Sequence, residues 1–142
     1  MNIDSIKTGF VIDHIEAGKA MPLYRLLKLN ELECSVAMIM NVTSKKLGKK
    51  DIIKIDDDID INLDAIGFID PNATVNIIRD GVLAEKKTIP MPRELTNILR
   101  CKNPRCISST EQELPQRFRL ADEANKIYRC VYCDSKNSDY IK

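Results

Sequence analysis

The chain has 142 residues and a mass of 16.1 kDa, enough for one domain or for two small ones. Its 22 basic and 21 acidic residues give a net charge of +1, whereas a general nucleic-acid binder usually carries a basic excess. No apolar stretch approaches the roughly 18 residues that a membrane helix needs. The N-terminus shows no signal-peptide pattern, so we expect a cytoplasmic protein with no membrane or nucleic-acid partner.

In chain order, the first part of the sequence predicts alternating strands and helices. Alternating or continuous apolar patterns predict five strands, over 9–16, 34–44, 51–56, 73–79 and 81–89. Apolar residues at helical spacing predict helices over 19–30 and 62–70. Between these elements, 45–50 is expected to be a basic turn, and Asp80-Gly81 favours a hairpin turn. The order is that of a ferredoxin-like fold with one extra strand, which predicts an α+β domain whose antiparallel sheet has two helices on one face.

The chain is expected to divide near residues 93–100. Pro90 and Pro92 precede a short helical pattern formed by Leu95, Ile98 and Leu99, which is typical of a connector. Residues 1–95 contain 13 basic and 15 acidic side chains, whereas residues 96–142 contain 9 and 6. The opposite net charges favour two modules, a domain over 1–95 and a small β-rich domain over 96–142.

Four of the five cysteines lie in the second module, as two close pairs: Cys101 and Cys106, then Cys130 and Cys133. Two such pairs predict a tetrahedral site for one structural Zn²⁺, because four thiolates leave no open coordination position. An iron–sulfur cluster would use the same ligands. Disulfides would need an oxidising compartment, and a redox Cys-x-x-Cys would need a thioredoxin-like context. The fifth, Cys34, lies in an apolar run and is expected to be a buried strand residue.

A cluster of charge marks the first module: Lys45, Lys46, Lys49, Lys50 and Lys54, followed directly by four aspartates between 56 and 60. The simplest interpretation is a solvated turn and an acidic loop. However, strand alternation places Lys50, Ile52 and Lys54 on one face, which suits a ligand with a flat ring and phosphates. In the first strand, His14 is either a packing residue or a ligand contact, and the neighbouring Asp13 needs polar partners if it is buried. No glycine-rich phosphate loop or nucleophile elbow occurs, so nothing indicates an enzyme.

Four segments together resemble one family: TGFVIDHI (8–15), LGKKDIIKI (47–55), PNATVNII (71–78), and CKNPRCIS with CVYC in the cysteine module. In this order over nearly the whole chain, they resemble the regulatory chain of aspartate carbamoyltransferase. The resemblance implies a non-catalytic subunit in pyrimidine biosynthesis. Its first domain would bind CTP as inhibitor and ATP as activator, and its zinc domain would contact a catalytic chain. It also implies a homodimer of regulatory chains.

The resemblance further implies which residues hold the nucleotide and the metal. The nucleotide contacts would be Ile6, Val11, Asp13, His14, Lys50, Ile52, Lys54, Asn76, Ile78 and Lys86, and the zinc ligands Cys101, Cys106, Cys130 and Cys133. Two other interpretations stay open. A small nucleotide-binding enzyme would need a catalytic constellation. A nucleic-acid-binding module would need aromatic residues on the sheet, and Phe10 is the only aromatic residue in the predicted strands of the first module.

Overall fold

The computed structural model describes residues 7–45, 48–136 and 139–140. The chain forms two compact units, Met1–Pro90 and Met91–Lys142. Residues 91–95, which the sequence analysis assigned to the first module, therefore belong to the second unit. None of the helices in the described part of the chain is long and apolar enough to cross a membrane.

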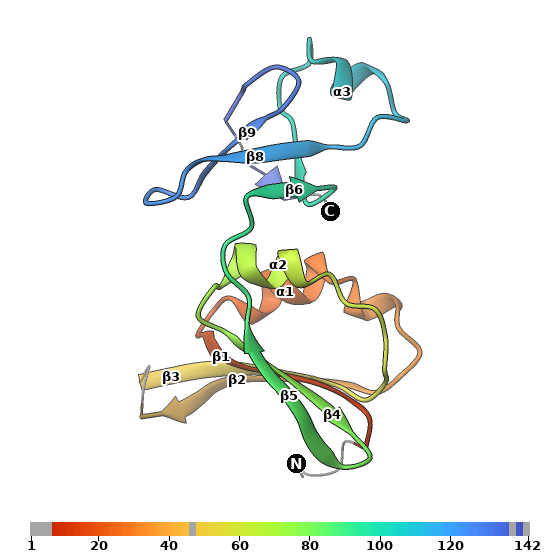
Figure 1. The fold of residues 1–142 in the computed structure, drawn as a ribbon, viewed down its shortest axis with the longest axis vertical. Coiled ribbons are helices and arrows are strands. Elements are labelled where there is room, and N and C mark those ends of the chain that lie inside the picture. The colour runs from red at the N-terminus through yellow and green to blue at the C-terminus, as the bar shows by residue number, and fades with distance from the viewer. Residues whose placement is uncertain (1–6, 46–47, 137–138, 141–142) are drawn as a thin grey trace. The chain divides into compact units, whose positions relative to one another are not determined.

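The first unit is a five-stranded antiparallel sheet in the order β2-β3-β1-β4-β5. Both helices, α1 and α2, lie on the same face of this sheet (Figure 1). The first four strands have the ferredoxin-like order and β5 extends it at one edge, which confirms the predicted α+β fold. The elements are β1 (Gly9–Glu16), α1 (Ala20–Leu26), the short 3-10 helix η2 (Leu29–Glu31), β2 (Val36–Ser44), β3 (Gly48–Ile55), α2 (Leu63–Ile69), β4 (Thr74–Arg79) and β5 (Val82–Thr88).

The main core lies between the sheet and the two helices. Ile12 on β1 is opposite Ile53 on β3 and opposite Val75 on β4, and all three side chains are fully buried. On the helices, Leu23 and Ile66 are equally buried. Burying each of these side chains contributes about 2 kcal/mol to the free energy of folding. Strand alternation then turns the intervening residues of β1, β3 and β4 to the other face, which neither α1 nor α2 covers.

Two β-bulges interrupt regular pairing on either side of β3. One extra residue is inserted in β1 between Ile12 and Ile15, and another in β2 between Ile39 and Val42. Each bulge contains a residue with positive φ, His14 at 56° in β1 and Asn41 at 61° in β2. Bulges bend a strand and redirect its side chains, so these two shape the open face of the sheet near His14 and Asn41.

Asp51 on β3 joins these features from the helix side of the sheet. Its fully buried carboxylate accepts backbone hydrogen bonds from Gly18 (3.0 Å) and Ala20 (3.3 Å) at the start of α1, and from Asn41 (3.0 Å) in the β2 bulge. A buried carboxylate needs such partners to offset the loss of its hydration. Asp51 therefore fixes the start of α1 and the bulge of β2 to the centre of the sheet.

Some local details of the first unit agree with the expectations from the sequence, and others differ. The hairpin expected at Asp80-Gly81 is confirmed, because both residues have positive φ, as a two-residue type I′ turn requires. The first helix is shorter than expected and ends at Leu26, because Lys28 adopts a left-handed conformation. Part of the expected basic turn belongs to β3, which begins at Gly48. Cys34 was expected to be buried in a strand, but it is half-buried and precedes β2.

The second unit is rich in β structure, as expected. It contains a three-stranded sheet, β6-β8-β9, and a separate pair, β7-β10. Leu95, Phe118 and Tyr128 lie on these strands and are fully buried, so they form its apolar core. Its elements are β6 (Glu94–Thr96), β7 (Leu99–Arg100), α3 (Ile107–Thr110), β8 (Arg117–Asp122), β9 (Ile127–Cys130) and β10 (Asp139–Tyr140).

The helical pattern expected at residues 95–99 is wrong. Leu95 lies in β6 opposite Phe118 of β8, whereas Leu99 lies in β7. Between them, Asn97 has φ of 58°, which ends one strand before the next begins. The apolar spacing that resembled a helix thus reflects two short strands that each bury a leucine.

Candidate metal centre and ligand face of the sheet

The structure brings the four predicted metal ligands together. The Sγ atoms of Cys101, Cys106, Cys130 and Cys133 all lie within 4.8 Å of one another. Cys101 Sγ lies 3.5 Å from Cys133 Sγ, and Cys106 Sγ lies 3.7 Å from Cys130 Sγ. A tetrahedron with Zn–S bonds of about 2.3 Å has sulfur atoms about 3.8 Å apart. The centre therefore fits one structural zinc, with all four positions filled by protein sulfur.

The Gln116 side chain braces the first cysteine pair, Cys101 and Cys106. Cys101 follows β7 and Cys106 precedes α3, whereas the other two ligands lie at the end of β9 and in the turn after it. The Gln116 side chain accepts a hydrogen bond from the Cys101 backbone N–H (3.0 Å) and donates one to the Ser108 carbonyl (2.9 Å). It thereby ties together the two arms of the first cysteine pair.

Three of the ligand sulfurs have pKa values that their surroundings shift. Burial raises the pKa of the Cys101 thiol to about 12 and also raises that of Cys130. Burial acts in the same direction on Cys133, but hydrogen bonds from Ser135 outweigh it and lower the pKa of Cys133 to about 6. Four thiolates this close together repel one another, so a divalent cation is needed to keep all of them ionised.

A second set of predicted residues forms a row across the open face of the first sheet. Lys54 on β3 is opposite Val11 on β1, which is opposite Asn76 on β4, which is opposite Lys86 on β5. Residues paired in this way share a face, so two lysines flank an apolar and an amide side chain. The Asn76 amide donates to the Val11 carbonyl (3.2 Å), which fixes its orientation. We call the open face that carries this row the ligand face, after the nucleotide contacts predicted there.

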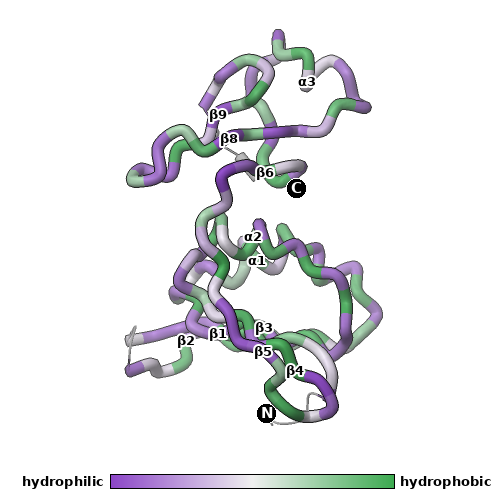
Figure 2. Tube along the Cα trace, viewed as in Figure 1, coloured by the Kyte–Doolittle hydropathy of each residue, from purple (hydrophilic) through white to green (hydrophobic). Residues whose placement is uncertain are grey.

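An apolar cluster lies within the ligand face. Val11 and Ile52 are buried there, with Ile39, Val42 and Ile78 packed against them. Three of the residues predicted for nucleotide contact, Val11, Ile52 and Ile78, are thus together. At one end of the row Lys54 is almost fully buried, at 3% exposure, whereas Lys86 at the other end is exposed on the edge strand β5. Along β5 the chain turns from hydrophobic in the first half to hydrophilic in the second half (Figure 2).

Asp13, His14 and Lys50 meet at the β1 bulge. The Lys50 Nζ lies 2.9 Å from Asp13 Oδ1, which also accepts a hydrogen bond from the His14 backbone (2.6 Å). Burial raises the pKa of Asp13, but the bonds from Lys50 and His14 outweigh this and hold the pKa below its usual value. Regular alternation would put Asp13 and His14 on opposite faces. The bulge breaks that alternation, and the His14 Nδ1 is buried with no hydrogen-bond partner among the described residues.

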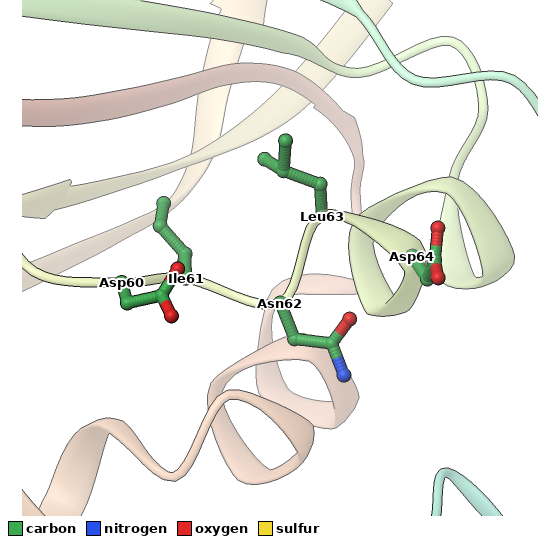
Figure 3. Close-up of a pocket in the computed structure, with 5 residues that line it drawn as sticks. All are labelled: Asp60, Ile61, Asn62, Leu63 and Asp64. Carbon is green, nitrogen blue, oxygen red and sulfur yellow. The ribbon is translucent and has the colours of Figure 1, made fainter. Parts of the chain in front are cut away.

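Two surface cavities of this chain lie outside the ligand face. A cavity of about 420 Å³ is lined by the single segment 60–64, which includes the first two residues of α2 (Figure 3). In that view, Ile61 and Leu63 point to one side of the segment and Asn62 to the other. A second cavity, of about 480 Å³, adjoins Cys101 and Gln116 in the second unit. Neither contains a residue predicted for the nucleotide. Ile6, which was also predicted, lies outside the described residues.

Sequence reasoning missed the residues that hold these sites in place. Asp51 and Asp70 are both buried carboxylates, and Asp70 accepts backbone bonds from Glu16 (2.9 Å) and Asn72 (3.0 Å). Asp51 in DIIKI has the same sequence signal as Asp13, because both are acids in an apolar strand and need polar partners when buried. Gln116 has no such signal, because its neighbours in the sequence are mostly polar.

These features define a class: an α+β chain of two units, one with a lysine-flanked open sheet face and one built around a four-cysteine centre. The sequence matches the family described as aspartate carbamoyltransferase regulatory chain, allosteric domain, over residues 1–90, and the metal binding domain of the same chain over residues 93–141. The protein therefore belongs to the family of aspartate carbamoyltransferase regulatory chains. It is a regulatory and not a catalytic chain, as the sequence led us to expect.

Relatives from several bacteria have the same name, and the similarity covers almost their full length. The aspartate carbamoyltransferase regulatory chain of Clostridium acetobutylicum is 49% identical over 134 residues, which cover 94% of this chain and 92% of the relative. That of Clostridium tetani is 49% identical over 135 residues, or 94% of each chain. That of Bifidobacterium longum is 41% identical over 136 residues, or 96% of this chain and 98% of the relative.

Proposed function

We propose that this chain binds CTP and ATP on the ligand face of its first unit and contacts catalytic chains of aspartate carbamoyltransferase through its zinc-bearing unit. CTP would act as feedback inhibitor and ATP as activator of pyrimidine biosynthesis. The compartment we propose is the cytoplasm, because thiolates that bind zinc must stay reduced.

The observation that carries the nucleotide proposal is the row Lys54–Val11–Asn76–Lys86. Lysine ammonium groups bind phosphates as compact point charges. The apolar cluster around Val11 and Ile52 offers a surface for a flat base. The Asp13 carboxylate can accept hydrogen bonds from a ribose or a base amine, and the buried His14 Nδ1 offers a further polar contact. The face thus combines the three chemistries that a nucleoside triphosphate presents.

Opposite effects of two nucleotides at one face require linkage. A ligand shifts a two-state equilibrium only by the difference between its affinities for the two states. The lysines would supply phosphate affinity common to both nucleotides, and contacts with the base would have to distinguish CTP from ATP. Couplings of this kind typically amount to about 1–3 kcal/mol.

The homodimer is also part of the proposal. The two edges of the first sheet are β2 and β5, and edge strands offer unpaired backbone groups to a second chain. On β2, Met40 is 50% exposed, which adds apolar surface at that edge. A sedimentation mass of one chain at micromolar concentration would contradict the dimer.

Titration calorimetry with Lys86→Ala and Lys87→Ala tests the ligand face. Lys86 belongs to the row, whereas its neighbour Lys87 is opposite Val75 on the other face and lies 4.0 Å from Glu85. We expect Lys86→Ala to weaken CTP and ATP binding about tenfold, as the loss of one charge-assisted phosphate contact predicts. Lys87→Ala should bind both nucleotides like the wild type.

Unchanged affinity in Lys86→Ala, or equal losses in both variants, would contradict the assignment of the ligand face. Single-stranded RNA serves as a further arm of the same experiment. The regulatory interpretation requires that the chain bind CTP and not the RNA. Binding of RNA with no binding of CTP would favour the nucleic-acid module that the sequence left open.

A further inference from the structure

The sulfur pairs Cys106–Cys130 and Cys101–Cys133 divide the metal centre into two halves. Beyond its two ligands, the first of these halves includes a serine hydroxyl. Cys106 Sγ lies 3.7 Å from Cys130 Sγ and 3.0 Å from Ser108 Oγ. Ser108 is only 4% exposed, so its hydroxyl is shielded from water and needs a partner within the protein. The Ser108 backbone carbonyl is in turn held by Gln116, which fixes the turn that carries the hydroxyl.

The second half of the centre repeats this arrangement. Cys133 Sγ lies 3.5 Å from Cys101 Sγ and 3.2 Å from Ser135 Oγ. In both halves the serine follows its cysteine by two residues, and the cysteine is the second of its pair in sequence. Each close sulfur–sulfur contact therefore contains one sulfur with a hydroxyl beside it. This regularity goes beyond what a tetrahedral site requires of its ligands.

The direction of these hydrogen bonds follows from the charge on sulfur. A cysteine bound to a metal has lost its proton, so it can only accept, and the serine hydroxyl must donate. Hydrogen bonds to a charged acceptor are stronger than neutral ones. Each bond draws electron density away from one thiolate, and partners of this kind orient metal ligands and tune the bound ion.

We propose that Ser108 and Ser135 are positioning residues of the metal centre, which donate hydrogen bonds to the metal-bound thiolates of Cys106 and Cys133 and so set the metal affinity of the centre and the reactivity of its sulfurs. This inference rests on the four-cysteine centre alone and is independent of the nucleotide proposal.

The two serines should differ in one respect. Cys101, Cys106 and Cys130 are buried, at 6% exposure or less, whereas Cys133 is half-buried. Among the four ligand sulfurs, a reagent dissolved in water therefore reaches Cys133 most easily. Ser135 donates to this accessible sulfur and protects it, whereas Ser108 donates to a sulfur that the reagent does not reach.

Cobalt spectroscopy on the full chain tests the hydrogen bonds directly. With Co²⁺ in the centre, we expect Ser108→Ala and Ser135→Ala each to move the sulfur-to-cobalt charge-transfer band to longer wavelength, because the thiolate becomes more electron-rich. Ser109→Ala is the matched control, since the Ser109 hydroxyl in the same turn donates to the Asn103 carbonyl (2.7 Å) and not to sulfur. Ser135→Thr, which keeps the hydroxyl, should restore the wild-type band. In competition with a chromophoric chelator, each alanine variant should bind zinc about tenfold more weakly.

Alkylation of the zinc-loaded chain by iodoacetamide separates the two serines. In this reaction a sulfur lone pair forms the S–C bond as iodide leaves. The half-buried Cys34 also reacts, so alkylation is followed by mass spectrometry of the peptide that contains Cys133. We expect Cys133 in Ser135→Ala to react about fivefold faster, within what the loss of one hydrogen bond to a charged group allows, and Cys133 in Ser108→Ala to react as in the wild type.

An unchanged band in Ser135→Ala with one cobalt bound, or an equal shift in Ser109→Ala, would overturn the proposal. If Ser108→Ala fails to take up cobalt, the half-buried position 135 decides the matter by itself, because its alanine and threonine variants can be compared in a folded centre.

Discussion

At the scale of single residues, two aspartates on adjacent strands serve opposite faces of one sheet. Asp51 is fully buried on the helix side and accepts three backbone hydrogen bonds, from Gly18, Ala20 and Asn41. Asp13 lies on the ligand face, where its partner is the Lys50 ammonium. The burial and hydrogen-bond partners of each aspartate thus decide its role: Asp51 stabilises the fold, and Asp13 presents a carboxylate on the open face.

Asp51→Ala should lower the free energy of unfolding of the first unit by about 3 kcal/mol, because it leaves buried backbone donors unsatisfied. Denaturant unfolding, followed by the circular dichroism of the chain, measures this change. Asp56→Ala is the control, since Asp56 is exposed directly after the same strand. Equal stability of the two variants would contradict the role assigned to Asp51.

The Asp13–Lys50 pair predicts a dependence of stability on acid. Because the pKa of Asp13 is lower in the folded chain than its ordinary value of 3.8, ionised Asp13 stabilises the fold above pH 3.8. This contribution is lost as the pH falls through the folded pKa. The stability difference between wild type and Asp13→Asn should therefore be constant from about pH 7 to pH 5 and shrink below pH 4. A difference that stays constant down to pH 3 would show that the ion pair contributes nothing.

At the scale of elements, sequence pattern predicted the first unit well because local and global preferences agree there. The apolar alternation of β1 and β4 and the Asp80-Gly81 turn all favour the observed sheet. The pattern failed at Leu95–Leu99, where two short strands mimic helical spacing. The extents of helix α1 and strand β3 depended on single backbone conformations, at Lys28 and Gly48, that spacing does not encode.

The same contrast applies to the sites. Spacing alone predicted that the four cysteines converge, because tetrahedral coordination limits the possibilities. The row of Lys54, Val11, Asn76 and Lys86 depends on the register of four strands, which required either the structure or the family resemblance. The bulge that reconciles Asp13 with His14 has no clear signal in the sequence, because neither residue is glycine.

The folding of the second unit should depend on bound zinc. It spans only residues 91–142, and few large apolar side chains support it, so binding of the ion supplies folding free energy. Adding a strong chelator should unfold this unit and leave the first unit folded. Two-dimensional NMR can show this as the selective loss of dispersed resonances from residues 91–142. Retention of those resonances after complete removal of zinc would contradict the account.

At the scale of the whole molecule, the proposal divides binding and docking between the two units. Cys106→Ala removes a zinc ligand, so we expect it to abolish assembly with catalytic chains while CTP binding by the first unit persists. Calorimetry and gel filtration with catalytic trimers measure the two properties on the same sample. A stable complex formed by this variant would contradict the docking role of the metal-bearing unit.

The central claim is that nucleotides on the ligand face control chemistry performed by another chain. Its most direct test is the aspartate saturation curve of the enzyme reconstituted from this chain and its catalytic chains, with and without CTP or ATP. We predict that CTP raises and ATP lowers the aspartate concentration needed for half-maximal rate, and that Lys54→Met abolishes both shifts. Curves that neither nucleotide moves in the wild-type complex, or that still move in Lys54→Met, would contradict the account.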